Sequence, residues 1–354
     1  MRCLFALTGR PIFAGSALAD QTRLEPFEKS KPRELAVPVS DQPFDAEEAL
    51  NGALSSPQHC ARVPNGLWIE VDGQGDCVRC YAQGLSSSAN PRCLVFFGGD
   101  VMLWTTKGVR YITPSYAASS PSVIEGDMAE WSREAGLPAI YLARPGIYGS
   151  SGDHNMRRRY REIALMSCAL DRIKERHGIS SFILAGQSGG GQIVAALLNW
   201  RTDVEAAVIT SGLVSTKQGA AYWENRREIP GRLLYDAAAF YDPVDEVERI
   251  PQDPAPQIYV ISDPEDRSVP FYSQLYYVRR LRAAGLEPQH IYAHAPGPRR
   301  HLLAQHGKRA AALVAQGRTA PEIRTALHEL DLEQLAKVAL AGGPNRDVSQ
   351  DKRR

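Results

Sequence analysis

The sequence predicts an α/β protein with a mostly parallel sheet of eight strands, helices on both faces of the sheet and a small cap. From residue 67 onward, short apolar runs alternate with longer runs whose apolar residues recur at helical spacing, which is typical of βαβ units. The composition, with 44% hydrophobic and 23% charged residues, is that of a globular protein with a large buried core. At 354 residues the chain is long for one domain, but α/β sheets reach this size as a single unit.

Eight strands are expected, each a short run rich in apolar residues, and the first two are expected to be antiparallel. In chain order they span residues 67–71, 78–83, 93–97, 139–143, 182–185, 206–210, 258–262 and 291–294. Helices are expected between them at residues 121–135, 158–177, 190–200 and 270–284. Gly136 and Gly285 stand at the ends of the first and the last of these helices, where glycine commonly terminates a helix.

The strands and helices together predict a catalytic domain over residues 67–306. Residues 213–256 fall between two strands and are rich in aromatic side chains, which favours a small cap over the carboxyl edge of the sheet. Residues 20–66 lack steady periodicity and are expected to form an N-terminal arm on the surface. Residues 307–341 show helical spacing, and residues 342–354 are expected to be a disordered tail.

Residues 1–19 have the features of a secretory signal peptide. Arg2 precedes an apolar run, and Ala17-Leu18-Ala19 forms an A-x-A cleavage pattern. Arg10 and Pro11 interrupt the apolar segment, so an ordinary N-terminus stays an alternative. The sequence therefore predicts a periplasmic or secreted protein, with a cytoplasmic protein as the alternative.

The overall charge excludes a general attraction to polyanions. Lysine and arginine number 41 against 40 aspartate and glutamate residues, a net charge of +1, so neither nucleic acid nor an anionic membrane surface is expected as a partner. The local basic run Arg157-Arg158-Arg159 is interpreted as the solvated start of a helix. No uninterrupted apolar run approaches the about 18 residues that a membrane-spanning helix needs.

The six cysteines allow a disulfide but give little support to a metal site. Cys77 and Cys80 form a CxxC pair, but a zinc ribbon needs a second such pair, so no metal is expected. In an exported protein, a disulfide from Cys60 to Cys77 or Cys80 would attach the N-terminal arm to the first strands. Cys168 lies on a stretch of helical period and is expected to be a buried free thiol.

The strongest motif is Gly186-Gln187-Ser188-Gly189-Gly190, a G-x-S-x-G pattern between a predicted strand and a predicted helix. A serine on such a sharp turn presents its Oγ above the sheet only when the flanking residues lack side chains. Ser188 is therefore the predicted nucleophile.

A serine nucleophile needs a histidine base that a carboxylate orients. His301 follows the last predicted strand in a loop at the carboxyl edge of the sheet, which is where the base is needed. Asp263 and Asp266 both follow the strand at residues 258–262. Asp266 is preferred as the triad acid because a few residues of loop let its side chain turn back to the histidine, and Asp263 is the alternative.

The oxyanion of an acyl-transfer reaction needs two backbone N–H donors. Gly189, directly after the nucleophile, is expected to supply one. The second is expected from the loop Gly98-Gly99-Asp100 after an early strand, from the N–H of Asp100 or of its neighbour Gly99.

Residues 67–306 resemble the α/β-hydrolase superfamily, since Ser188, Asp266 and His301 follow one another in that family's Ser, acid, His order. Residues 144–150 resemble the family's R-x-G-x-x-x-S loop, and residues 266–270 and 297–301 resemble its acid and histidine loops. The resemblance implies an α/β-hydrolase fold, and the small cap is similar to those of dienelactone-hydrolase-like and serine-peptidase-like branches. Gly98-Gly99 departs from the His-Gly pair that the family usually has before the second oxyanion donor.

These residues predict a serine hydrolase that cleaves a carboxylic ester, acting on a small-molecule ester or a short peptide. No cofactor is expected, because acyl transfer by a triad needs none. Tyr148, Gln187 and Trp223 are the expected substrate contacts. The alternatives are a peptidase or aminopeptidase-like amide hydrolase on the same triad, a binding protein that shares the fold without catalysis, and a metal or redox module on Cys77 and Cys80.

Overall fold

The computed structural model describes residues 30–85 and 92–341, without the side chains of residues 338–341. The predicted signal peptide at residues 1–19 and the predicted tail at residues 342–354 lie outside the described residues. No helix in the described part of the chain is both long and apolar enough to cross a bilayer.

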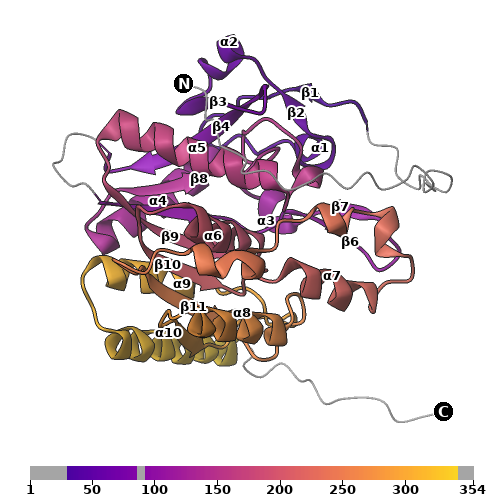
Figure 1. Cartoon of the computed structure of the whole chain (residues 1–354). Helices are drawn as coiled ribbons and strands as arrows, with labels where there is room; N and C mark the ends of the chain where they lie inside the picture. The colour runs from indigo at the N-terminus through magenta and orange to yellow at the C-terminus, as the bar shows by residue number, and fades with distance from the viewer. Residues whose placement is uncertain (1–29, 86–91, 342–354) are drawn as a thin grey trace, which may run out of the picture.

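The central sheet has eight strands in the order β12-β11-β10-β9-β5-β8-β4-β3 (Figure 1). β4 is antiparallel to β3 and β8, and the other neighbours are parallel. The predicted fold class, a mostly parallel eight-stranded sheet, is therefore confirmed. The strands are β3 (Gly66–Val71), β4 (Gln74–Gln83), β5 (Arg92–Phe97), β8 (Ala139–Leu142), β9 (Ser181–Gln187), β10 (Val204–Thr210), β11 (Gln257–Ser262) and β12 (Gln289–Tyr292).

The last strand was predicted two residues too late, at residues 291–294 rather than Gln289–Tyr292. After Tyr292 the chain leaves the sheet, and the backbone N–H of Ala295 donates to the carboxylate of Asp263 at 2.8 Å instead of to a neighbouring strand. A carboxylate from another loop thus accepts the hydrogen bond that a neighbouring strand would otherwise accept. The apolar pattern of the sequence does not show where this change occurs.

Helices cover both faces of the sheet, as the alternation of strands and helices predicts (Figure 1). Val95 of β5 belongs to one apolar cluster with α5, α6 and α8, whereas Leu94 and Phe96 belong to a second with α4, α9 and α10. Successive side chains of a strand point to opposite faces, so each face acquires its own core. The helices are α4 (Pro121–Ala135), α5 (Tyr160–His177), α6 (Gly189–Trp200), α8 (Phe271–Ala283), α9 (Ala304–Ala315) and α10 (Ala320–Ala341).

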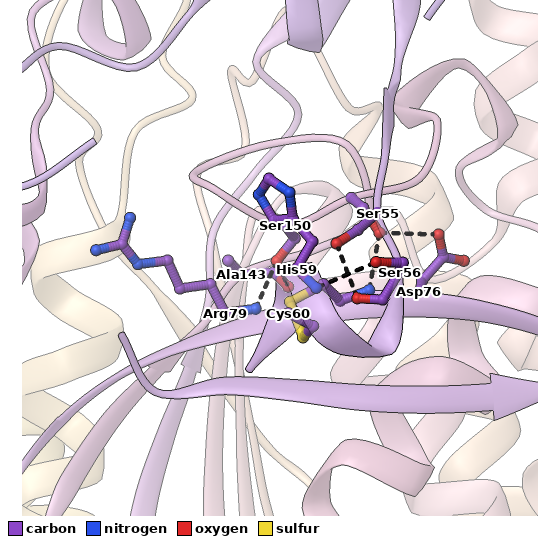
Figure 2. Close-up of a disulfide and its surroundings, with 10 residues drawn as sticks. Ser55, Ser56, His59, Cys60, Asp76, Arg79, Ala143 and Ser150 are labelled. Carbon is purple, nitrogen blue, oxygen red and sulfur yellow. Dashed lines mark hydrogen bonds between the residues drawn. A yellow bond between two sulfur atoms is a disulfide. The ribbon is translucent and has the colours of Figure 1, made fainter. Parts of the chain in front are cut away.

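The N-terminal arm is attached to the sheet by a disulfide between Cys60 and Cys77 (Figure 2). Of the two partners that the sequence left open, Cys77 is therefore the one used, and Cys80, Cys93 and Cys168 are buried and take no part in a disulfide. The arm contains β1 (Arg33–Glu34), α1 (Ala46–Asn51), β2 (Ala53–Leu54) and α2 (Pro57–Cys60).

The strand that carries Cys77 also holds the loop after β8. Ser150 Oγ accepts a hydrogen bond from the Arg79 N–H at 2.8 Å and donates to the Ala143 carbonyl at 3.1 Å (Figure 2). Ser151 Oγ accepts from the Cys77 N–H at 2.8 Å. The arm, β4 and this loop therefore form one connected unit.

Between β5 and α4 lies a hairpin that the apolar pattern did not predict, formed by β6 (Met102–Trp104) and β7 (Arg110–Ile112), followed by α3 (Pro114–Ala117). Residues 213–256, the predicted cap, contain α7 (Thr216–Glu224) and the 3-10 turns η2 (Gly231–Leu233), η3 (Ala237–Ala239) and η4 (Pro243–Arg249). In η4, Val244 and Val247 are buried in the cluster of α6 and α8, so the end of this segment is part of the core.

Candidate active site

Ser188 occupies a strained turn between β9 and α6. Its backbone has φ 56° and ψ −116°, in the left-handed range that non-glycine residues rarely adopt. A Cβ at Gly186 would lie 2.3 Å from the Gly190 carbonyl oxygen, and a Cβ at Gly190 would lie 2.0 Å from the Phe97 carbonyl oxygen. Only glycine fits at these two positions, which explains the sequence pattern around the serine.

His301 and Asp266 are paired. Nδ1 of His301 donates to Oδ2 of Asp266 at 2.8 Å, and the carboxylate is fully buried. The other carboxylate oxygen accepts from the backbone N–H groups of Ser268, at 2.7 Å, and Val269, at 3.0 Å. The buried carboxylate therefore fixes the ring so that Nε2 is free to accept a proton.

Asp263, the alternative acid, has a different set of partners. Its carboxylate accepts from Arg300 Nε at 2.7 Å and from the backbone N–H groups of Glu265 and Ala295, both at 2.8 Å. Burial alone would raise the pKa of Asp263, but these donors outweigh burial and lower it. Asp263 thus ties the acid loop to the histidine loop, and Asp266 is the acid that contacts the histidine.

Ser188 and His301 line the same cavity of about 840 Å³. Within the described residues, no hydrogen bond joins Ser188 Oγ to the His301 ring. Such a bond often forms or tightens only when substrate is bound. The shared cavity brings the predicted nucleophile and the predicted base to the same opening.

Gln187 was predicted to contact substrate, but its amide group is engaged within the protein. Its Oε1 accepts from Thr210 Oγ1 at 2.9 Å and from the Leu303 N–H at 3.0 Å, and its Nε2 donates to the His301 carbonyl at 2.8 Å. Gln187 also lines the cavity. The side chain thus connects the nucleophile turn to the loop that carries the histidine.

The predicted oxyanion loop lies against the nucleophile. A Cβ at Gly99 would be 3.3 Å from Ser188 Cβ, and a Cβ at Gly189 would be 2.3 Å from Oδ1 of Asp100. In residues 30–85 and 92–341, no acceptor is found for the backbone N–H of Gly99 or Asp100. Gly189 opens α6, where the first N–H groups have no partner inside the helix. The three N–H groups are therefore available to a ligand beside Ser188.

The Asp100 side chain is buried in a cluster of ion pairs. It accepts a hydrogen bond from Arg144 Nη1 at 2.8 Å, lies 3.1 Å from Nε of Arg157 in an ion pair, and also pairs with Arg158. Burial alone would raise the pKa of Asp100, but the three guanidinium groups hold it well below its usual range. Arg144 also pairs with Glu162 at 2.8 Å, so the cluster connects the oxyanion loop to α5.

The interpretation of Arg157-Arg158-Arg159 as a solvated helix start is therefore wrong for its first two members. Arg157 is 5% exposed and Arg158 is 6% exposed. They are buried because Asp100, more than fifty residues earlier in the chain, lies beside them. No spacing in the sequence indicates such a pairing.

Tyr148 and Trp223, the other predicted substrate contacts, both line the cavity. Tyr148 has φ 52°, and its ring centroid lies 4.8 Å from that of Tyr116 and 5.4 Å from that of Tyr141. Trp223, on α7, donates its Nε1–H to the Ser268 carbonyl at 2.8 Å. This bond joins the cap to the acid loop. The missed hairpin adds Leu103, Trp104 and Tyr111 to the cavity wall.

The described residues contain no group of three or more His, Cys, Asp or Glu side chains arranged to hold a metal. Cys77 is in the disulfide, so its sulfur is not a free thiolate. The CxxC pair therefore does not form a zinc site in this structure.

No model of a known protein family matches the chain, and no curated protein matches it. Solved structures do resemble it. The esterase Pf2001 of Pyrococcus furiosus aligns with a TM-score of 0.50 at 10% identity, over 75% of this chain and 93% of that one. Est1E from Butyrivibrio proteoclasticus aligns with a TM-score of 0.46 at 12% identity, over 72% and 100%.

An acylaminoacyl peptidase of Pyrococcus horikoshii aligns with a TM-score of 0.44 at 14% identity, over 65% of this chain. The chain spans only 36% of the length of that peptidase. At such identities the similarities concern the fold of the chain and leave its chemistry to its own residues.

Proposed function

The chain has the α/β-hydrolase fold, and from that premise we propose that it is a serine hydrolase that cleaves carboxylic esters through an acyl-enzyme on Ser188. One observation carries the proposal: a serine on a strained turn opens into the same cavity as a histidine whose Nδ1 is held by a buried carboxylate. This combination is what activates a serine hydroxyl.

In the proposed reaction, Nε2 of His301 accepts the proton of Ser188 Oγ while that oxygen attacks the ester carbonyl. The tetrahedral intermediate collapses, the C–O bond to the alcohol breaks, and His301 gives its proton to the departing oxygen. A water molecule then attacks the acyl-enzyme with His301 again as the base. The acid is released and Ser188 is restored. Asp266 stabilises the imidazolium in both halves of the reaction.

The negative oxygen of the intermediate is proposed to lie between Gly189 and the loop that contains Gly99 and Asp100. Backbone N–H groups in a preorganised site stabilise such an oxygen strongly, and loss of one donor typically costs about 10²–10³-fold in rate. The ion pairs of Asp100 support this role, because they hold the loop rigidly against the nucleophile turn.

The test is covalent labelling of the folded protein with a fluorophosphonate, followed by intact mass. We expect a single adduct on the wild-type protein and none on Ser188→Ala. A panel of esters that the wild-type protein hydrolyses should not be turned over by that variant. A folded wild-type protein that forms no adduct, or an adduct that persists in Ser188→Ala, would contradict the proposal. A panel of peptide amides alongside the esters distinguishes an esterase from a peptidase on the same residues.

A further inference from the structure

The candidate active-site cavity carries a local excess of positive charge. The chain as a whole has a net charge of only +1. The cavity is nevertheless lined by six arginines and, among the described residues, by one carboxylate, that of Asp100. The arginines come from the start of α5, the end of α7, the acid loop and the histidine loop, and they are Arg157, Arg158, Arg226, Arg227, Arg267 and Arg299.

The carboxylate does not neutralise this excess. Asp100 is already shared by Arg144, Arg157 and Arg158. No carboxylate in the described part of the chain lies within 4 Å of the guanidinium groups of Arg226, Arg227, Arg267 or Arg299. Several of these arginines are exposed to solvent, but Arg158 is buried and Arg227 is half-buried. Positive charge therefore remains unpaired within a partly enclosed cavity, where it attracts anions more strongly than on an open surface.

Aromatic rings contact three of these guanidinium groups, and for Arg226 and Arg227 they do so where no carboxylate of the described residues is within 4 Å. The guanidinium carbon of Arg226 lies 3.5 Å from the ring centroid of Tyr222, and that of Arg227 lies 5.3 Å from the ring centroid of Tyr235. The guanidinium carbon of Arg158 lies 5.2 Å from the ring centroid of Trp223. A guanidinium over a ring is stabilised through its face, while its N–H donors lie in its plane and point elsewhere.

Some of those donors are buried and unused. Within the described residues, Nε of Arg158 and Nε of Arg227 have no hydrogen-bond partner. An unsatisfied buried donor is costly, and it is costlier when the group is charged. Burial also lowers the pKa of Arg158 to about 10 despite the neighbouring Asp100. A ligand anion would supply the acceptor that the protein itself does not provide.

We infer that the cavity selects esters that carry a carboxylate, with Arg227 and the aromatic residues of the cap holding the anion and the apolar body of the substrate. This inference rests on the proposed ester hydrolysis and names its substrate class. Arginine suits the role because its planar fork of donors binds both oxygens of a carboxylate. The walls formed by Trp104, Tyr148 and Trp223 suit the apolar remainder.

The first experiment measures binding without catalysis, by calorimetry with phenylpentanoate and its neutral amide, phenylpentanamide. We expect the carboxylate to bind at least about tenfold more tightly than the amide, and this preference to weaken as salt is raised. Arg227→Gln should remove most of the preference. Arg232→Gln is the matched control, because it removes the same charge from an exposed position of the cap outside the cavity.

The second experiment measures turnover of two esters of equal acyl length, mono-para-nitrophenyl adipate and para-nitrophenyl hexanoate. We expect kcat/KM for the adipate to exceed that for the hexanoate by about tenfold, mainly through KM. Arg227→Gln should lower kcat/KM for the adipate about tenfold and change that for the hexanoate by less than about twofold.

These outcomes separate the two proposals. Equal binding of carboxylate and amide, or equal loss in Arg227→Gln and Arg232→Gln, would overturn the carboxylate inference while Ser188 labelling still supports a hydrolase. Tighter binding of phenyl phosphate than of phenylpentanoate would also overturn it. If the carboxylate binds in an arginine-dependent way but no ester is turned over, the proposed ester hydrolysis is contradicted, and with it the inference that the substrate is an ester.

Discussion

The two sides of the cavity are built in different ways. On one side, Ser188, Asp266 and His301 stand on loops that directly follow β9, β11 and β12, so each residue is placed by the strand before it. On the other side, Asp100 is held by arginines from the loop after β8 and from the start of α5. The first side follows mainly from strand ends and local turns, with Asp263 and Gln187 joining its loops, whereas the second depends entirely on contacts between distant segments. The two sides should therefore respond differently to substitution.

The largest expected effect tests the local side. Asp266→Asn keeps the size of the side chain but removes the charge that orients the histidine, so we expect turnover to fall about 10⁴-fold. Asp263→Asn is the matched control, because the Asp263 carboxylate is equally buried in the same loop but contacts Arg300 rather than His301. It should lower turnover by less than about tenfold. Ester kinetics on both variants measure the difference, and a larger loss in Asp263→Asn would reverse the assignment of the acid.

The next effect tests the distant side through stability. Asp100→Asn leaves the guanidinium groups of Arg144, Arg157 and Arg158 buried without their carboxylate, which should lower the free energy of unfolding by about 3–5 kcal/mol. Asp245→Asn breaks an exposed ion pair with Lys217 and should cost less than about 1 kcal/mol. Denaturant unfolding of both variants measures these changes. Equal losses would show that the buried cluster adds nothing beyond an exposed pair.

The same cluster gives the pH dependence a definite sign. Because the arginines hold the pKa of Asp100 well below its usual value, the carboxylate stabilises the folded state fully above its unfolded pKa of about 3.9. That contribution is lost as the pH falls from this value towards the folded pKa. The difference in Tm between the wild type and Asp100→Asn should therefore be constant near neutrality and narrow below about pH 4. A gap that widens on acidification would contradict this account of the cluster.

The contrast also explains how far the sequence could be interpreted. The sheet and the serine turn leave local marks in the sequence. Apolar runs mark the strands, and Ser188 is flanked by glycines at positions where the structure has no room for a Cβ. The preference for Asp266 over Asp263 also agrees with the geometry, because loop length limits which side chain reaches His301. The buried Arg157 and Arg158 left no such mark, because three successive arginines look solvated until Asp100 is placed beside them. Gln187 stays a predicted substrate contact that lines the cavity, but its hydrogen bonds with Thr210 and Leu303 left no mark either, since these partners are distant in sequence.

The smallest expected effect is at the junction of the two sides, where the cap meets the acid loop. Trp223→Phe keeps an aromatic face beside Arg158 but removes the hydrogen bond from Nε1 to the Ser268 carbonyl, which follows Asp266 by two residues. A neutral hydrogen bond of this kind contributes about 1 kcal/mol, so kcat/KM for esters should fall by no more than about tenfold. Trp68→Phe is the control, since Trp68 lies on β3 outside the cavity and also donates its Nε1–H, to Glu70 at 3.2 Å.

The two kinetic constants distinguish two roles of the cap. Because Ser268 also donates to the Asp266 carboxylate at 2.7 Å, Trp223→Phe would lower kcat if the cap positions the acid. If the cap only contacts substrate, Trp223→Phe would raise KM and leave kcat unchanged.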